Sequence, residues 1–175
     1  MNTIRGEYDF SVHEAGHCAF AQMLKLDPIN YVTLIQDGSM IGHVNFGKTR
    51  PIETKEHAVR QSFMICAGWA AENVLIWDRG LAALPSGNDR DDIKELCPKF
   101  FVASKERSAE YLSHCWNETN ALMNTSVLDA IKILARELRA NTRLSGDDLE
   151  QIFSKHLIDA SQCDAAVERI LSAFN

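Results

Sequence analysis

The segment His13-Glu14-Ala15-Gly16-His17 constrains this chain more than any other part of its sequence. It lies within residues 10–26, whose apolar side chains recur with the period of an α-helix. Two histidines four positions apart on a helix project from the same face, with Cβ atoms ~6 Å apart. Both imidazoles can then bind one cation. We therefore expect a helix near the start of the chain that carries a metal site.

The residue types at this spacing favour zinc and a hydrolytic reaction. Imidazole nitrogens bind zinc at ~2.0–2.1 Å. Glu14 lies about 100° around the helix axis from His13, so it does not join the same tetrahedron but can reach a water molecule on the metal. Zinc lowers the pKa of such a water, and a carboxylate can accept its proton during attack on a carbonyl. The pattern His-Glu-x-x-His is typical of zinc metallopeptidases, with the glutamate as general base.

The same residues also allow simpler interpretations. Ser11 precedes Glu14 by three positions, which is the spacing of a capping box at the start of a helix, so Glu14 could serve only as a cap. The histidines could be core residues that share this spacing by chance. Gly16 favours the metal site, because glycine costs ~1 kcal/mol relative to alanine inside a helix and so indicates close packing beside His17.

The rest of the sequence predicts a mainly α (α+β) fold in a single domain over residues 1–175. Segments 31–35 and 40–46 are rich in β-branched and aromatic residues and flank a turn, so they predict a β-hairpin or small sheet. A loop with glycine and proline is expected over residues 78–88, and a kink or break near Pro98. Helices are predicted over residues 53–77, from 89 onward, and over 105–123, 126–140, 145–157 and 162–174.

Composition and charge exclude several classes of partner. The net charge is −6 and no basic run occurs, which argues against nucleic-acid binding. No apolar run approaches the ~20 residues of a membrane helix, so no membrane association is expected. The five cysteines are odd in number and form no Cys-x-x-Cys pair, which favours reduced thiols and a cytoplasmic location.

Several short segments occur in an order known from one protease family. The segments are His13–Ala19, Tyr31–Ile35, Gly42–Val44, Ala67–Glu72 and Leu144–Leu149. Together they resemble the peptidase domain of FtsH-type zinc metalloproteases. That domain has a His-Glu-Ala-Gly-His-Ala helix, a Val-Thr-Ile-rich strand, a Gly-Tyr-Thr edge strand, a Gly-Gly-Arg-Ala-Ala-Glu helix and a Leu-Asp-Gly-Glu-Glu-Ile segment. The resemblance covers residues 11–153, and a C-terminal helix over 160–175 follows.

The resemblance implies a third zinc ligand from an aspartate at the start of a later helix, after a Thr-Gly or Ser-Gly loop. Residues 86–92 (SGNDRDD) occupy that place. Counting from Gly87 favours Asp91, whereas the helix face favours Asp89, because the positions four, seven and eight residues after Asp89 are apolar. We choose Asp89 as the ligand beside His13 and His17. The alternative is that these aspartates only stabilise a helix N-terminus.

Other residues receive supporting roles. Glu72 is the candidate to accept a hydrogen bond from a zinc-bound histidine, with a buried capping or packing role as the alternative. The four remaining histidines are expected on the surface or in packing contacts: His43, His57, His114 and His156. Core packing is expected for the three tryptophans: Trp69, Trp77 and Trp116.

The sequence also departs from the family. It contains neither the membrane segments nor the ATP-driven unfoldase that precede the peptidase domain there, and no Gly-x-x-x-x-Gly-Lys-Ser/Thr loop. We therefore expect an ATP-independent zinc endopeptidase that cleaves peptides or unfolded segments, alone or supplied by a separate unfoldase or adaptor. The strand at Gly42–Phe46 could bind an extended substrate by adding it to the sheet edge. Hexamer formation is not implied.

Two other functions remain open at this point. The chain could be a catalytically silent binding or regulatory module that keeps the fold, although a structural zinc site has no need of Glu14. It could also be a protease with one specific cellular target.

Overall fold

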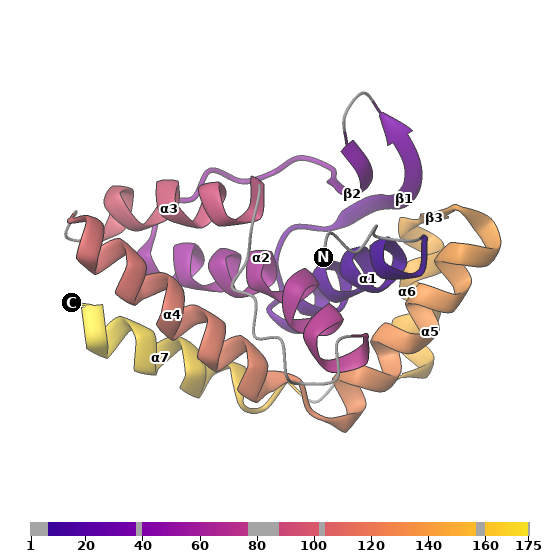
Figure 1. Cartoon of the computed structure of the whole chain (residues 1–175). Coiled ribbons are helices and arrows are strands. Elements are labelled where there is room, and N and C mark those ends of the chain that lie inside the picture. The colour runs from indigo at the N-terminus through magenta and orange to yellow at the C-terminus, as the bar shows by residue number, and fades with distance from the viewer. Residues whose placement is uncertain (1–6, 38–39, 77–87, 102–103, 157–159, 175) are drawn as a thin grey trace.

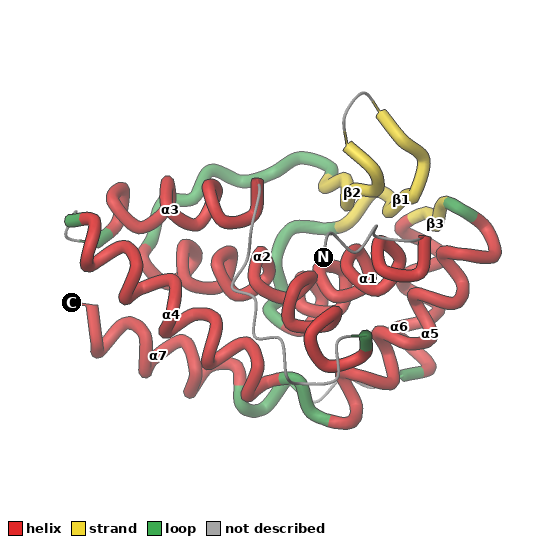
Figure 2. The backbone as a smooth tube through the Cα atoms, viewed as in Figure 1, coloured by secondary structure: helices red, strands yellow, loops and turns green. Residues whose placement is uncertain are grey.

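The computed structural model of the protein describes residues 7–37, 40–76, 88–101, 104–156 and 160–174. These residues are mostly helical with one small antiparallel sheet, as predicted (Figure 1, Figure 2). The helices are α1 (Glu7–Met23), α2 (Lys55–Leu75), α3 (Asn88–Phe100), α4 (Lys105–Leu122), α5 (Thr125–Asn141), α6 (Gly146–Lys155) and α7 (Cys163–Phe174). The strands are β1 (Ile29–Asp37), β2 (Met40–Phe46) and β3 (Arg143–Ser145).

The sheet has the strand order β2-β1-β3, so β1 is central and β2 lies at one edge. The predicted hairpin is confirmed as the antiparallel pair of β1 and β2, in which Val32 faces Val44. The third strand, β3, was not predicted. It has three residues and pairs Val32 with Leu144, so neither its length nor its local composition distinguishes it from a turn.

The core forms where α1 packs against α2 on one side and α5 on the other. Figure 1 shows α1 and α2 at the centre of the molecule, with the hairpin above α1 in this view. The two helices approach closely at Gly16, where an added Cβ atom would lie 2.6 Å from the carbonyl oxygen of Ala67. The close packing predicted at Gly16 is thus confirmed, and α2 is largely buried as expected.

The ends of α1 differ from the prediction. The helix begins at Glu7, so the fully buried Ser11 lies inside it and the predicted capping box with Glu14 is wrong. The part of α1 before Ser11 is a single turn, which is too short to show helical periodicity by itself. At its other end α1 stops at Met23, where Lys25 takes the left-handed conformation (φ 53°) common after a helix C-terminus.

The N-terminus of α2 is capped by Thr54, whose hydroxyl accepts a hydrogen bond from the backbone N–H of His57 at 3.1 Å. We expect Thr54→Ala to lower the free energy of unfolding by about 1 kcal/mol, because one backbone donor loses its partner. Urea denaturation measures this difference. Thr54→Ser retains the hydroxyl and should unfold at the wild-type urea concentration; an equal loss in both variants would contradict the capping role.

Later elements also refine the prediction. α3 continues past Pro98 to Phe100, so the proline does not break it there. Pro98 lies in the last turn of α3, so only the two residues that follow it complete the helix. The predicted loop over residues 78–88 lies almost entirely outside the described residues, as does Trp77. The five cysteines are all buried and none forms a disulfide, as expected for reduced thiols. None of the described helices combines the length and apolarity needed to cross a bilayer.

Candidate metal centre

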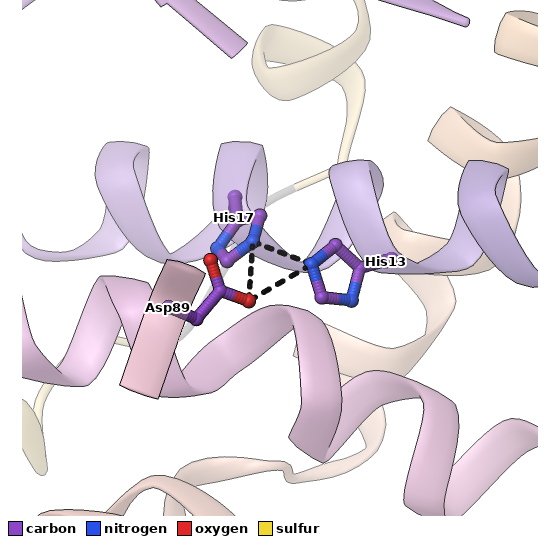
Figure 3. Close-up of side chains that lie close together, drawn as sticks. All are labelled: His13, His17 and Asp89. Carbon is purple, nitrogen blue, oxygen red and sulfur yellow. Dashed lines mark hydrogen bonds and ion pairs between the residues drawn. The ribbon is translucent and has the colours of Figure 1, made fainter. Parts of the chain in front are cut away.

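Three side chains from two helices converge beside the crossing of α1 and α2. His13 and His17 project from α1, one turn apart, and Asp89 reaches them from the first turn of α3 (Figure 3). The Nε2 atoms of the two histidines are 3.0 Å apart. The Oδ2 atom of Asp89 lies 3.2 Å from Nε2 of His13 and 3.9 Å from Nε2 of His17. The three potential ligand atoms therefore form a compact triangle.

This triangle fits a tetrahedral zinc ion. Zinc with ligand bonds of ~2.0–2.1 Å keeps neighbouring ligand atoms about 3.3–3.4 Å apart, and the observed separations of 3.0–3.9 Å span that value. Two imidazoles and one carboxylate are also a donor set that catalytic zinc sites use, since three protein ligands leave the fourth position open. Both the geometry and the chemistry of the cluster are suited to zinc.

Helix α2 holds both imidazoles by their other ring nitrogen. His13 Nδ1–H donates to Oε1 of Glu72 at 2.6 Å, and His17 Nδ1–H donates to the backbone carbonyl of Met64 at 2.8 Å. These hydrogen bonds fix the orientation of each ring, so that its Nε2 atom points toward the other two potential ligand atoms. The prediction that Glu72 supports a histidine is confirmed as a contact, and the carboxylate is fully buried. The hydrogen bond from His17 to the Met64 carbonyl could not be predicted, because every residue has a backbone carbonyl.

Gly68 makes room for the imidazoles. A Cβ atom added there would lie 2.6 Å from Nε2 of His17 and 2.7 Å from Cε1 of His13. Neither distance is compatible with a side chain. Ala67 and Gly68 of α2 are therefore both small for a structural reason. Ala67 allows α1 to approach at Gly16, and Gly68 leaves space for the two imidazole rings.

The structure distinguishes between the two candidate aspartates. Asp89 is part of the triangle, whereas the side chain of Asp91 is 72% exposed and pairs with Lys94 at 3.3 Å. The helix-face argument is thus correct about which carboxylate lies near the histidines. Buried Ile93 shares the face of Asp89, as that argument required. Counting from the glycine pointed to Asp91, which is not part of this cluster.

Trp69 is partly buried and packs against the core, as predicted, but it also has a polar contact at the cluster. Its indole Nε1–H donates to Oδ2 of Asp89 at 2.8 Å. Its ring also stands edge-on to the ring of His13, with centroids 5.6 Å apart and an interplanar angle of 88°. An aromatic residue on an apolar helix face gives no indication of such a bond. For Trp116, which is buried in α4, the packing prediction is confirmed.

Charge at the cluster favours a cation. Burial disfavours the charged form of His13, but hydrogen bonds with Asp89 and Glu72 and the charge of Glu14 outweigh it and raise the pKa of His13 to about 9. Burial and the neighbouring charge of His13 lower the pKa of His17 to about 4. Burial opposes ionisation of Asp89, yet the two histidines lower its pKa overall. The surrounding carboxylates therefore stabilise positive charge where the ligand atoms meet.

Glu14 lies next to the triangle without belonging to it. Its side chain is 6% exposed and reaches β2, where an added Cβ at Gly42 would lie 3.1 Å from its Oε1. Gly42 has φ +80°, a conformation that glycine adopts readily. Glu14 is thus a buried acid that follows His13 in α1 and approaches the edge strand β2 at Gly42.

The other histidines lie apart from the triangle, as predicted. His43 is on β2 and contacts the ring of Tyr31, and His114 contacts the ring of Phe174. Among the described residues, the metal-ligand geometry is met by the group of His13, His17 and Asp89.

Comparison of the chain with protein-family models gives no match, and comparison with curated proteins gives none either. The functional argument therefore depends on the geometry of the cluster and on the chemistry of its residues.

Proposed function

We propose that the protein is a zinc-dependent metalloendopeptidase in which His13, His17 and Asp89 bind the metal and Glu14 is the general base. The observation that carries this proposal is the convergence of two Nε2 atoms and one Oδ2 atom within 3.9 Å of each other. A purely structural site does not require a buried acid beside its first ligand. The resemblance to the FtsH-type peptidase domain points to the same activity.

The chemistry divides between the metal and the chain. A bound zinc ion would act as a Lewis acid and lower the pKa of water in its open position. Glu14 accepts the proton of the attacking water and later returns it to the amine that leaves. Glu72 and the carbonyl of Met64 keep the imidazoles in the orientation that this requires. Burial of Glu14 limits its solvation and strengthens its electrostatic contacts.

An extended peptide is the substrate that best suits the sheet. β2 is an edge strand and has no partner strand on its outer side among the described residues. A peptide that pairs with β2 forms backbone hydrogen bonds and passes close to Gly42, which contacts Glu14. An extended, unfolded segment can pair in this way. We propose that folded proteins reach the site after a separate unfoldase or adaptor has exposed such a segment.

Metal content tests the ligand assignment. We expect the purified protein to contain zinc, and Asp89→Ala to lower zinc affinity by roughly 100-fold or more, because loss of a ligand exceeds the ~10–100-fold effect of an outer contact. Asp91→Ala is the matched control and should retain zinc, since the Asp91 side chain is exposed and paired with Lys94. Elemental analysis after dialysis measures both. Retention of zinc by Asp89→Ala, with loss in Asp91→Ala, would refute the assignment.

A further inference from the structure

Asp89 is the least buried of the three proposed ligands. Its side chain is 24% exposed, compared with 10% for each histidine. A carboxylate has two equivalent oxygens and can present either or both to a metal. A hydrogen bond from another element to one of these oxygens would make the two oxygens differ.

Trp69 forms a hydrogen bond with one of the two carboxylate oxygens of Asp89. Its indole N–H donates to Oδ2, the same atom that lies 3.2 Å from Nε2 of His13. A carboxylate oxygen has two lone pairs, so Oδ2 can accept this hydrogen bond with one and bind a cation with the other. Trp69 also directly follows Gly68 and precedes Glu72 by three positions, so one face of α2 supports both a histidine and the aspartate.

We propose that Trp69 is a positioning residue for the metal site: its indole N–H holds Oδ2 of Asp89 toward His13 and His17, so that Asp89 binds through this one oxygen. This inference rests on the proposed function. A carboxylate held to one oxygen occupies a single coordination position. The fourth position then stays available to water or substrate.

Two substitutions separate the hydrogen bond from the ring. Trp69→Phe keeps an aromatic ring but removes the donor, whereas Trp69→Gln removes the ring but carries an N–H donor the same number of bonds from Cα. We expect Trp69→Phe to lower zinc affinity by ~10–100-fold, as for other outer contacts of a metal site. Trp69→Gln should retain affinity nearer to wild type. Trp116→Phe is the control for loss of a tryptophan away from the site.

The measurements are zinc affinity by competition with a chelator and the visible absorption spectrum of the Co²⁺-loaded protein. We expect the Phe variant to give a weaker cobalt spectrum, because a carboxylate that binds through both oxygens raises the coordination number. Circular dichroism verifies that each variant is folded. Trp116→Phe should match the wild type in both measurements.

The outcomes distinguish this inference from the function on which it rests. If the wild type binds neither zinc nor cobalt, the metal site and the role of Trp69 both fail. If the wild type binds metal and Trp69→Phe binds it equally well with the same spectrum, only the role of Trp69 fails. A Gln variant weaker than the Phe variant would assign the effect to ring packing and overturn the hydrogen-bond role.

Discussion

Replacement of Glu14 by glutamine is expected to abolish cleavage of unfolded casein while zinc stays bound. The amide is nearly isosteric with the carboxylate but cannot accept a proton, and a positioned general base contributes about 10²–10⁴-fold to a hydrolytic rate. Because Glu14 is not one of the three converging ligands, metal content should stay at the wild-type level. The measurement is the initial rate of casein cleavage together with zinc content of the same samples.

Glu53→Gln is the matched control for this substitution. Glu53 is an exposed residue before α2 and should retain full activity. Equal rates for wild type and Glu14→Gln would remove the enzymatic interpretation and favour a silent binding module with the same fold. A chelator should inactivate the wild type, and added zinc should restore the activity.

Gly68→Ala is expected to have the second large effect. The new methyl group would stand 2.6 Å from Nε2 of His17 and 2.7 Å from Cε1 of His13, so both rings must move away from the positions that direct them at Asp89. We expect loss of zinc binding. We also expect the free energy of unfolding to decrease by about 1–3 kcal/mol, which is typical of an overpacked core. Zinc titration and urea denaturation measure the two effects.

Gly47→Ala provides the control for this prediction. A Cβ atom at Gly47 would lie 3.6 Å from its nearest neighbour, Oδ1 of Asn30, which is an ordinary contact. This variant should bind zinc like the wild type. Normal zinc affinity in Gly68→Ala would show that the imidazoles can shift without consequence, and that the supports from α2 do not determine the site.

The proposed ligands could be predicted because their signals are local or periodic. Spacing along one helix brought His13 and His17 together, and the apolar face of α3 selected Asp89 over Asp91. Both arguments use the 3.6-residue repeat, but the third ligand was sought in residues 86–92 only because of the resemblance to the FtsH-type peptidase domain. Glu72 was found because zinc-bound histidines usually need an acceptor for their second nitrogen.

The parts that could not be predicted depend on tertiary contacts. The predicted capping box at Ser11 was wrong, because α1 begins one turn earlier, at Glu7, and Ser11 is buried inside the helix. The bond from Trp69 to Asp89 joins α2 to α3 and depends on their relative placement, which no periodicity encodes. β3 owes its existence to pairing with β1 across more than a hundred residues.

The distribution of the site along the chain has a consequence for its biosynthesis. Both imidazoles leave the ribosome before the groups that hold them. Their acceptors at Met64 and Glu72 follow some fifty residues later, and the carboxylate of Asp89 later still. An early nascent chain therefore presents two loosely oriented histidines and no complete coordination sphere. The proposed metal site has all three of its ligands only after Asp89 has been synthesised, so we expect no tight metal binding by a shorter nascent chain.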